Sequence, residues 1–181
     1  MRLFTSNFKK LPGAFLIASF LMLITVVVII RQKPVDYSGY AAAIIDKMQI
    51  LADAGSPKIV FIGGSSLAFG LDSQEIEKNT GITVVNMGLH ANLGLRFMTE
   101  QVKEYLAPGD IVVISPEYEY FYDNSLNGEG EYLLETLRLY PGGIKYITSP
   151  KQYLQLIKGI PIVFNNHLRS FLRLKDGGGC I

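Results

Sequence analysis

The sequence has 181 residues, which corresponds to one domain and little more. Apolar residues make up 49% and charged residues 18%, a composition that excludes a disordered or highly charged chain. One cysteine excludes an internal disulfide and a cysteine-rich zinc site, and a net charge of +1 gives no reason to expect nucleic acid. No spacing of His, Asp or Glu suggests a metal, and we expect no cofactor.

The charges are unevenly distributed along the chain. Residues 1–33 carry five basic residues and no acidic one, so their net charge is +5. Residues 34–140 carry six basic and fifteen acidic residues, which gives −9, and residues 141–181 carry six basic residues and one acidic residue, which gives +5. A basic start and a basic end therefore flank an acidic middle.

Residues 11–30 form a run of twenty residues without a charge. At about 1.5 Å per residue, a helix of this length spans about 30 Å, the hydrocarbon thickness of a bilayer. A small soluble domain rarely buries a helix that is apolar all round. A cleaved signal peptide is the other alternative, but its apolar region is normally about 7–15 residues and ends in a small-residue cleavage site. Here residues 26–30 run directly into Arg31, so we expect an uncleaved signal anchor.

The flanking charges predict the orientation of this transmembrane helix. Arg2, Lys9, Lys10 and the terminal amine precede the span, and two basic residues follow it. This small excess favours a cytoplasmic N-terminus. We therefore predict a single-pass protein of the cell membrane, with residues 1–10 as a basic cytoplasmic tail and the lipid bilayer as a partner through residues 11–30. The remainder, from the juxtamembrane segment and helix over residues 31–56 onward, is expected outside the cytoplasm.

Helices and short apolar strands alternate after the span. Apolar residues at helical spacing predict an amphipathic helix over about 38–54. Asp72 with Glu75 is a capping-box signature that opens a second helix, and a third extends from Leu95 to Tyr105. Apolar, β-rich runs predict strands over 58–62, 82–85 and 111–114. All three are near-continuous apolar runs, as in parallel strands that are buried on both faces, so the pattern predicts an α/β layered sheet.

The region 123–181 is predicted to be helical and basic. We expect helices over about 130–139, 150–158 and 161–175, with Gly159 ending the second. The third carries an apolar stripe with basic residues away from it: Phe164, Leu168, Phe171 and Leu172 against Arg169, Arg173 and Lys175. Such a helix either lies on an anionic membrane surface or packs on the domain core. Cys180 is second from the end, so it does not form a prenylation box.

Three turns are expected to meet beyond the carboxyl ends of the strands, where ligands bind in open α/β sheets: 63–66, 86–88 and 115–117. Two glycines before Ser65 let the backbone turn sharply and let a reacting group approach. A serine at a strand-to-helix turn exposes its hydroxyl, and the N–H groups of the helix start can face an oxyanion. Asn86 and Gly88 could supply a side-chain amide and a backbone N–H to the same point.

At these residues the chain resembles the SGNH (GDSL-like) hydrolase superfamily. The first block of that family is a strand followed by Gly-Asp-Ser or Gly-Ser-Ser, which residues 58–66 fit, and its second block places a glycine after a second strand, as in residues 84–88. The resemblance covers about residues 57–122. It implies a three-layer α/β/α fold, Ser65 as nucleophile, an oxyanion held by Gly88, Asn86 and the N–H of Ser65, and substrate contacts from Gly64 and Ser66.

The transmembrane anchor and the Ser-Pro pair after the third strand resemble the branch that handles acyl groups on cell-envelope polymers. The family's third block, Gly-x-Asn-Asp, is replaced by residues 115–118, and an ionised Glu117 can only accept hydrogen bonds. The family's base comes from Asp-x-x-His near the C-terminus. Neither histidine fits, because Met87 lies three residues before His90 and Phe164 three before His167. The family's sheet and triad are therefore expected to be incomplete in this chain, which is consistent with the front part of a longer protein.

Each candidate residue also has a structural alternative. Ser65 could be a turn residue or face a bound phosphate, although the Rossmann pattern G-x-G-x-x-G is not matched. Asn86 and Gly88 could simply end a strand. We expect His90 to be a loop or packing residue and His167 an exposed helix residue. The aromatic cluster over residues 118–122 is expected in the core or at its rim.

Two functions remain open from the sequence. The first is a membrane-anchored serine esterase or acyltransferase acting on an acylated envelope polysaccharide, which requires a base that we do not identify. The second is a non-catalytic, membrane-tethered module that binds a glycan or a protein partner in the same crevice.

Overall fold

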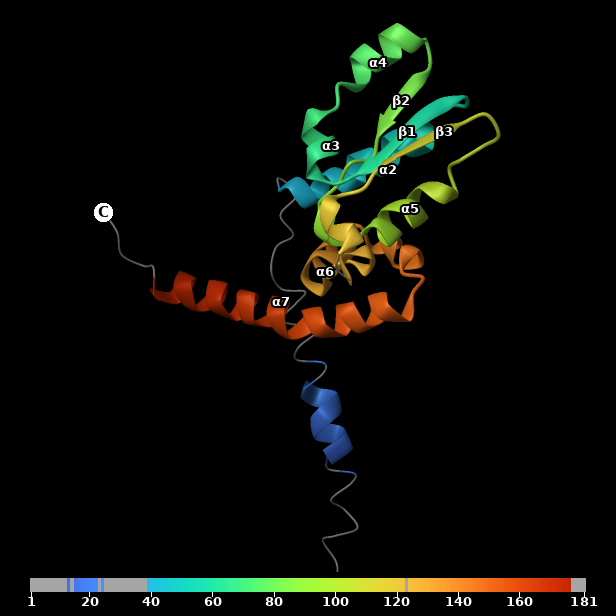
Figure 1. The fold of residues 1–181 in the computed structure, drawn as a ribbon. Coiled ribbons are helices and arrows are strands. Elements are labelled where there is room, and N and C mark those ends of the chain that lie inside the picture. Colours follow the sequence, from blue (N-terminus) through green and yellow to red (C-terminus); the bar gives the residue numbers. More distant parts are fainter. Residues whose placement is uncertain (1–12, 14, 23, 25–38, 123, 177–181) are drawn as a thin grey trace, which may run out of the picture. The chain divides into compact units, whose positions relative to one another are not determined.

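The computed structural model describes residues 13, 15–22, 24, 39–122 and 124–176 (Figure 1). The chain forms two compact units, Val35–Ile162 and a smaller one made of Met1–Pro34 with Val163–Ile181. The larger unit contains the sheet and all the candidate site residues discussed below. In the smaller unit, residues 15–22 are helical.

The larger unit is built on a sheet of three parallel strands, which confirms the α/β class (Figure 1). The strands are β1 (Lys58–Gly63), β2 (Thr83–Asn86) and β3 (Ile111–Ser115), in the order β2-β1-β3. Val60 in the central strand pairs with Val85 of β2 and Val112 of β3. The three predicted strands are thus confirmed to within one or two residues, and their carboxyl ends lie at one edge of the sheet.

Helices flank the sheet, and most were predicted from the sequence. The α-helices of this region are α2 (Ala43–Asp53), α3 (Ser65–Gly70), α4 (Ser73–Thr80), α5 (Leu95–Lys103) and α6 (Gly130–Leu139). The capping signature is confirmed, because the Asp72 carboxylate accepts a hydrogen bond from Glu75 N–H at 3.0 Å. Gly81 ends α4 with a φ of 69°, a left-handed conformation that favours glycine.

The core lies between β1, β2 and the helices α2 and α5. It contains fully buried residues from each of these elements, among them Ile44, Leu51, Val60, Val85 and Phe97. The helix α2 packs against β2, and α5 packs against β1. Burial of these apolar side chains fixes the positions of β1 and β2, and hence of the turns that follow them.

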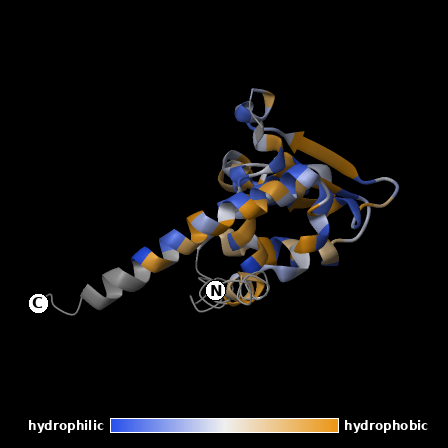
Figure 2. Cartoon of the chain, turned by 90° about the horizontal axis from the view of Figure 1, so that it is seen from below, coloured by the Kyte–Doolittle hydropathy of each residue, from blue (hydrophilic) through white to orange (hydrophobic). Residues whose placement is uncertain are grey.

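The expectation that all three strands are buried on both faces is wrong for β3. The exposed fractions along β3 are 49% for Ile111, 38% for Val112, 37% for Val113 and 47% for Ile114. The strands are nevertheless rich in hydrophobic residues, which Figure 2 colours orange. Successive side chains of a strand point to opposite faces, so exposure of all four means that both faces of β3 are open to solvent. The sequence shows an apolar run but not that β3 lacks the close helix contacts that cover β1 and β2 in the described part of the chain.

The expectation of two helices after residue 149 is also wrong. One helix, α7, runs from Pro150 to Asp176 and includes Pro161. Gly159 does not end the first half; it allows a close approach to the start of α6. A Cβ at Gly159 would lie 2.3 Å from the carbonyl carbon of Gly130, and a Cβ at Gly130 would lie 1.9 Å from the Gln155 oxygen. Glycine is therefore required here for packing rather than for a helix stop.

A buried ion pair joins the first residue of β1 to the turn that leads into β3. Lys58 Nζ lies 2.7 Å from an Asp110 oxygen, and the two side chains are 2% and 1% exposed. The other Asp110 oxygen accepts from Lys58 N–H at 3.0 Å. The hydrogen bond from the Lys58 side chain, opposed by desolvation, holds the pKa of Asp110 well below its usual range.

The structure bears only partly on the segment expected to cross the membrane. Half of residues 11–30 lie outside the described residues, as do the basic tail over 1–10 and the side chains of 170–176 in the basic helix. Among the helices that are described, none combines the length and the apolar character needed to span a bilayer.

Candidate functional site

Three glycines allow the turns after the strands to come into close contact. A Cβ at Gly63 would lie 2.7 Å from the carbonyl oxygen of Ser115, at the end of β3. A Cβ at Gly88 would lie 2.5 Å from the Ala68 backbone nitrogen in α3, and one at Gly64 would lie 2.0 Å from Glu117 Oε1. The structure therefore brings together the turns at 63–66, 86–88 and 115–117, as the sequence predicts for a parallel sheet.

A hydroxyl and a carboxylate are paired where β1 and β3 end. Ser66 Oγ donates a hydrogen bond to Glu117 Oε1 at 2.9 Å. Gly63 and Ser115 are register partners in the neighbouring strands, so Ser66 and Glu117 follow paired positions. Ser66 is exposed and Glu117 is half-buried, so a ligand in solution can reach the pair.

Ser65, the predicted nucleophile, is the first residue of α3 and is exposed. Its neighbour Ser66 is the hydroxyl that holds Glu117. Gly64 precedes both in an extended conformation, with a φ of −83°, and is buried against the Glu117 side chain. The strand–turn–helix context expected for Ser65 is therefore present at the carboxyl edge of the sheet.

Asn86 and Gly88, the predicted oxyanion donors, are hydrogen-bonded within the protein. Gly88 N–H donates to Asn86 Oδ1 at 2.9 Å, and Asn86 Nδ2 donates to the Leu67 carbonyl at 3.2 Å. Asn86 therefore ties the end of β2 to the first turn of α3, and Gly88 is bonded to Asn86 within its own turn. An oxyanion at this point would have to share or replace these bonds, so the assignment stays a prediction.

Lys47, in α2, supports the turn at residues 86–88. Its Nζ donates to the Asn86 carbonyl at 2.7 Å, which fixes the last residue of β2. Burial lowers the pKa of Lys47. Because the contact is made to a backbone oxygen, Lys47 positions the turn that carries Asn86 and Gly88.

An aromatic group from four separate segments borders the serine turn. The ring centroid of Tyr40 lies 4.8 Å from that of Phe69 in α3 and 6.2 Å from that of His90. His90 stacks on Tyr132, with 4.2 Å between the two ring centroids. The Tyr40 hydroxyl is buried without a hydrogen-bond partner among the described residues. Burial, and then the charge of Glu117, raise the pKa of Tyr40 to about 12, so this tyrosine is neutral at physiological pH.

The hydrogen bonding of His90 determines which of its ring nitrogens donates a hydrogen bond and which accepts one. Leu89 N–H donates to the Gly63 carbonyl at 3.0 Å, so His90 lies beside the serine turn. His90 Nδ1 accepts from Asn92 N–H at 3.2 Å. In the neutral imidazole this assigns the proton to Nε2, which makes Nε2 a donor and not a base. The geometry supports the packing role expected for His90. The side chain of His167 lies outside the described residues.

The aromatic segment after Glu117 is divided between core and surface. In the 3-10 helix Tyr118–Phe121, Tyr120 is 5% exposed and donates from its hydroxyl to the Ala91 carbonyl at 2.6 Å. Tyr118, Phe121 and Tyr122 are 74%, 70% and 73% exposed. The expectation of a core or rim position therefore holds for Tyr120 alone.

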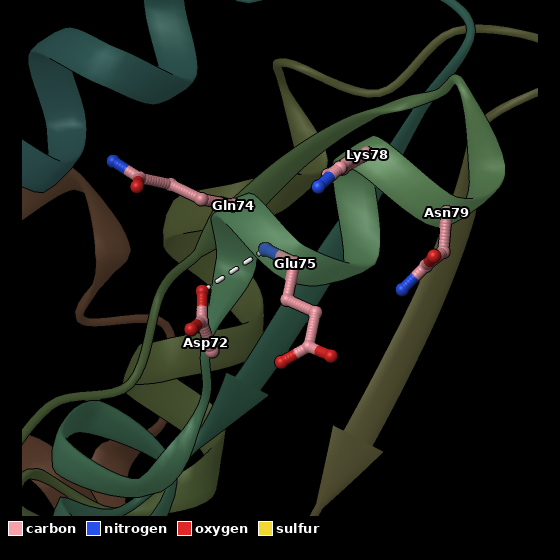
Figure 3. Close-up of a pocket in the computed structure, with 5 residues that line it drawn as sticks. All are labelled: Asp72, Gln74, Glu75, Lys78 and Asn79. Atoms are coloured by element: carbon pink, nitrogen blue, oxygen red, sulfur yellow. Dashed lines mark hydrogen bonds between the residues drawn. The ribbon is translucent and has the colours of Figure 1, made fainter.

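A surface depression of about 320 Å³ is lined by the outer side of α4 (Figure 3). Its lining residues are Asp72, Gln74, Glu75, Lys78 and Asn79. Asp72 and Glu75 are joined there by the bond that caps the helix. These residues come from one short segment, and the serine turn contributes nothing to the lining.

Metal ligands and known relatives add no further assignment. Within the described ranges, no three His, Cys, Asp or Glu side chains are grouped so that they could hold a metal ion. Comparison with known proteins found no matching family model, curated protein or solved structure.

Glu117, Tyr40 and Lys47 are site residues that the sequence did not identify as such. Glu117 was expected only as a departure from the family's third block, whereas it holds Ser66. One signal was available: Ser66 and Glu117 follow two parallel strands, and their contact requires only that β1 and β3 be neighbours. Tyr40 and Lys47 come from the segment before β1 and carried no local signal.

Proposed function

We propose that this chain is a membrane-anchored serine esterase or acyltransferase of the SGNH type, acting outside the cytoplasm on acylated cell-envelope glycan. The observation that carries the proposal is the hydrogen bond between Ser66 and Glu117 at the carboxyl edge of a parallel sheet, next to the exposed Ser65. Ligand sites of open α/β sheets lie at this edge. The anchor over residues 11–30 and the extracytoplasmic location belong to the same proposal.

The proposed reaction is transfer of an acyl group through Ser65. Its Oγ attacks the acyl carbonyl and gives its proton to Glu117. The acyl–oxygen bond to the sugar then breaks, and the leaving sugar oxygen takes this proton from Glu117. The Ser65 ester is then cleaved by water in an esterase, or by a second hydroxyl in an acyltransferase. Glu117 is the proposed proton acceptor of this turn because it already accepts a hydrogen bond from Ser66. Gly88 and Asn86 are the proposed oxyanion donors, with their mutual bond opening as substrate binds.

Acetate release from 4-nitrophenyl acetate and from acetylated xylan tests the proposal with the full chain in detergent. We expect Ser65→Ala to abolish turnover and Glu117→Gln to lower it about 100-fold, the usual range for loss of an acid–base group. Ser73→Ala, in a serine of α4 outside the turn, is the matched control and should retain full turnover. Equal turnover by wild type and Ser65→Ala contradicts the proposal.

A second candidate is a non-catalytic module that binds a glycan through the same edge of the sheet. The pairing of Gly88 N–H with Asn86 Oδ1 favours it, because the predicted oxyanion donors are already occupied. Isothermal titration with unacetylated and acetylated xylan separates the two candidates. Binding that survives Ser65→Ala, without acetate release by wild type, supports the module, whereas acetate release that depends on Ser65 supports the enzyme.

A further inference from the structure

Three aromatic side chains after β3 are exposed to an unusual degree. Tyr118, Phe121 and Tyr122 are each at least 70% exposed, and the one buried ring of this segment, Tyr120, anchors it by a hydrogen bond to Ala91. Exposed apolar groups that cluster on a surface mark sites of interaction more often than scattered single ones. The anchoring by Tyr120 fixes where the three rings are presented.

Two of these rings are held against each other. The hydroxyl oxygens of Tyr118 and Tyr122 lie 2.8 Å apart, and the ring centroids are separated by 4.8 Å at an interplanar angle of 40°. This arrangement restricts both side chains before any ligand binds. It also leaves ring faces open to solvent, as the exposed fractions show. The pair is therefore a preorganised aromatic surface.

The electrostatic surroundings of the rings are negative. Between Lys103 and Arg138 the sequence has eight acidic residues and no lysine or arginine, the acidic ones being Glu104, Asp110, Glu117, Glu119, Asp123, Glu129, Glu131 and Glu135. Glu117 and Glu119 flank Tyr118 in the sequence, and neither forms an ion pair with any described residue. Burial raises the pKa of Tyr120, and the negative charges of Glu117 and Glu119 raise it further.

Charge complementarity decides which ligand suits this surface. An anionic group would be repelled by the carboxylates, and a neutral apolar group would gain nothing from them. A cation gains from the carboxylates, and an organic cation also gains from the negative faces of the aromatic rings. A compact, strongly hydrated metal ion would use the rings poorly, because aromatic faces favour weakly hydrated ammonium groups.

We propose that Tyr118, Tyr122 and Phe121, together with the carboxylates of Glu117 and Glu119, bind an organic ammonium group. The site adjoins Ser66 through Glu117, so a bound cation would lie beside the serine turn. The inference rests on the exposed rings and on two carboxylates that have no counter-charge among the described residues. It does not depend on acyl chemistry at Ser65.

Choline and its neutral isostere 3,3-dimethylbutan-1-ol test the proposal directly, because they share a shape and differ in charge. The chain has no tryptophan, so its fluorescence comes from its ten tyrosines, two of which, Tyr118 and Tyr122, belong to this site. In titrations of the full chain in detergent at constant ionic strength, we expect choline to change the emission saturably and the isostere to bind about tenfold more weakly.

Matched variants locate the site. Tyr118→Leu, Tyr122→Leu and Glu117→Gln should each weaken choline binding several-fold, whereas Tyr153→Leu, in a half-exposed tyrosine of α7, should not. Ser65→Ala should also leave choline binding unchanged, which separates this site from the proposed nucleophile. Circular dichroism of each variant establishes that it is folded. Equal affinity for the isostere, or choline binding that survives Tyr118→Leu and Tyr122→Leu together, overturns the proposal.

Discussion

The strands β1 and β3 are neighbours with similar apolar sequences, yet their surroundings are opposite. Ile62 of β1 and Ile114 of β3 are register partners, but Ile62 is 2% exposed and Ile114 is 47% exposed. The difference arises because the helices α3 and α5 pack against β1, whereas no described helix makes a comparable contact with β3. The strand β2 also pairs on one side only, yet its Val84 and Val85 are buried because α2 and α4 pack against it. Cover by helices, and not the composition of the strand, therefore determines burial.

The candidate site joins these two regions. Ser65 and Ser66 follow the covered strand β1, whose core packing fixes them, and Glu117 follows the open strand β3. The Lys58–Asp110 pair links the opposite ends of the same strands. The covered region thus supplies a fixed hydroxyl, and the open region supplies the carboxylate and the exposed aromatic rings.

Breaking the Lys58–Asp110 pair is expected to have the largest effect on stability. Asp110→Asn leaves the buried Lys58 charge without its counter-charge, and such losses are among the most damaging single changes. Chemical denaturation should show a much lower free energy of unfolding than for Glu100→Gln, which breaks an exposed pair with Lys103 and should cost less than about 1 kcal/mol. Similar losses for the two variants would show that the buried pair does not secure β3.

The same pair predicts the direction of the pH dependence. Because Lys58 lowers the folded-state pKa of Asp110, its stabilising effect is present in full above the unfolded-state pKa of about 3.9. It is lost as the pH falls through that value toward the lower folded-state pKa. Melting curves should therefore show a fall in Tm below about pH 4 that is smaller in Asp110→Asn.

A matched pair of truncations measures the contrast between the strands. Ile62→Ala should lower the free energy of unfolding by about 2–5 kcal/mol, because it leaves a cavity in the core. Ile114→Ala, at the paired position of β3, should cost less than about 1 kcal/mol because nearly half of that side chain is already in water. Urea denaturation of both variants gives the comparison, and equal losses would show that β3 is covered in solution.

A substitution at Gly88 tests the contact between the turns after β1 and β2. A Cβ there would lie 2.5 Å from the Ala68 backbone nitrogen, so Gly88→Ala should cost about 1–3 kcal/mol and shift α3. The control is Gly70→Ala at the end of α3, where no atom lies within 4 Å of the added methyl group. If both variants were equally stable in urea, the turns would not be in contact.

The site variants should have the smallest effects on stability. Ser66→Ala and Glu117→Gln alter one exposed hydrogen bond, which contributes about 0.5–1.5 kcal/mol. Differential scanning calorimetry should therefore find Tm values close to that of the wild type. A large loss for either variant would mean that the pair holds β3 in place instead of serving the site.

The sequence predicted the structural features that depend on local patterns. It did not predict the features that depend on contacts between residues distant in sequence. Strand positions, the Asp72 cap and the helix at 130–139 follow from residue periodicity and capping chemistry, which are local. The exposure of β3 depends on which helices pack against each strand, and the role of Gly159 depends on Gly130, which is distant in sequence. In the site, the turn around Ser65 was predictable, but the Ser66–Glu117 bond and the pairing of Gly88 with Asn86 were not.

The central claim, covalent chemistry at Ser65, is tested most directly by a fluorophosphonate probe with mass-spectrometric mapping of the modified residue in the folded full chain. We expect one phosphonylated residue, Ser65, with labelling lost in Ser65→Ala and slowed in Glu117→Gln. Ser66→Ala should still be labelled. Absence of an adduct on Ser65 in the folded wild type would contradict the account and leave the edge of the sheet as a binding site only.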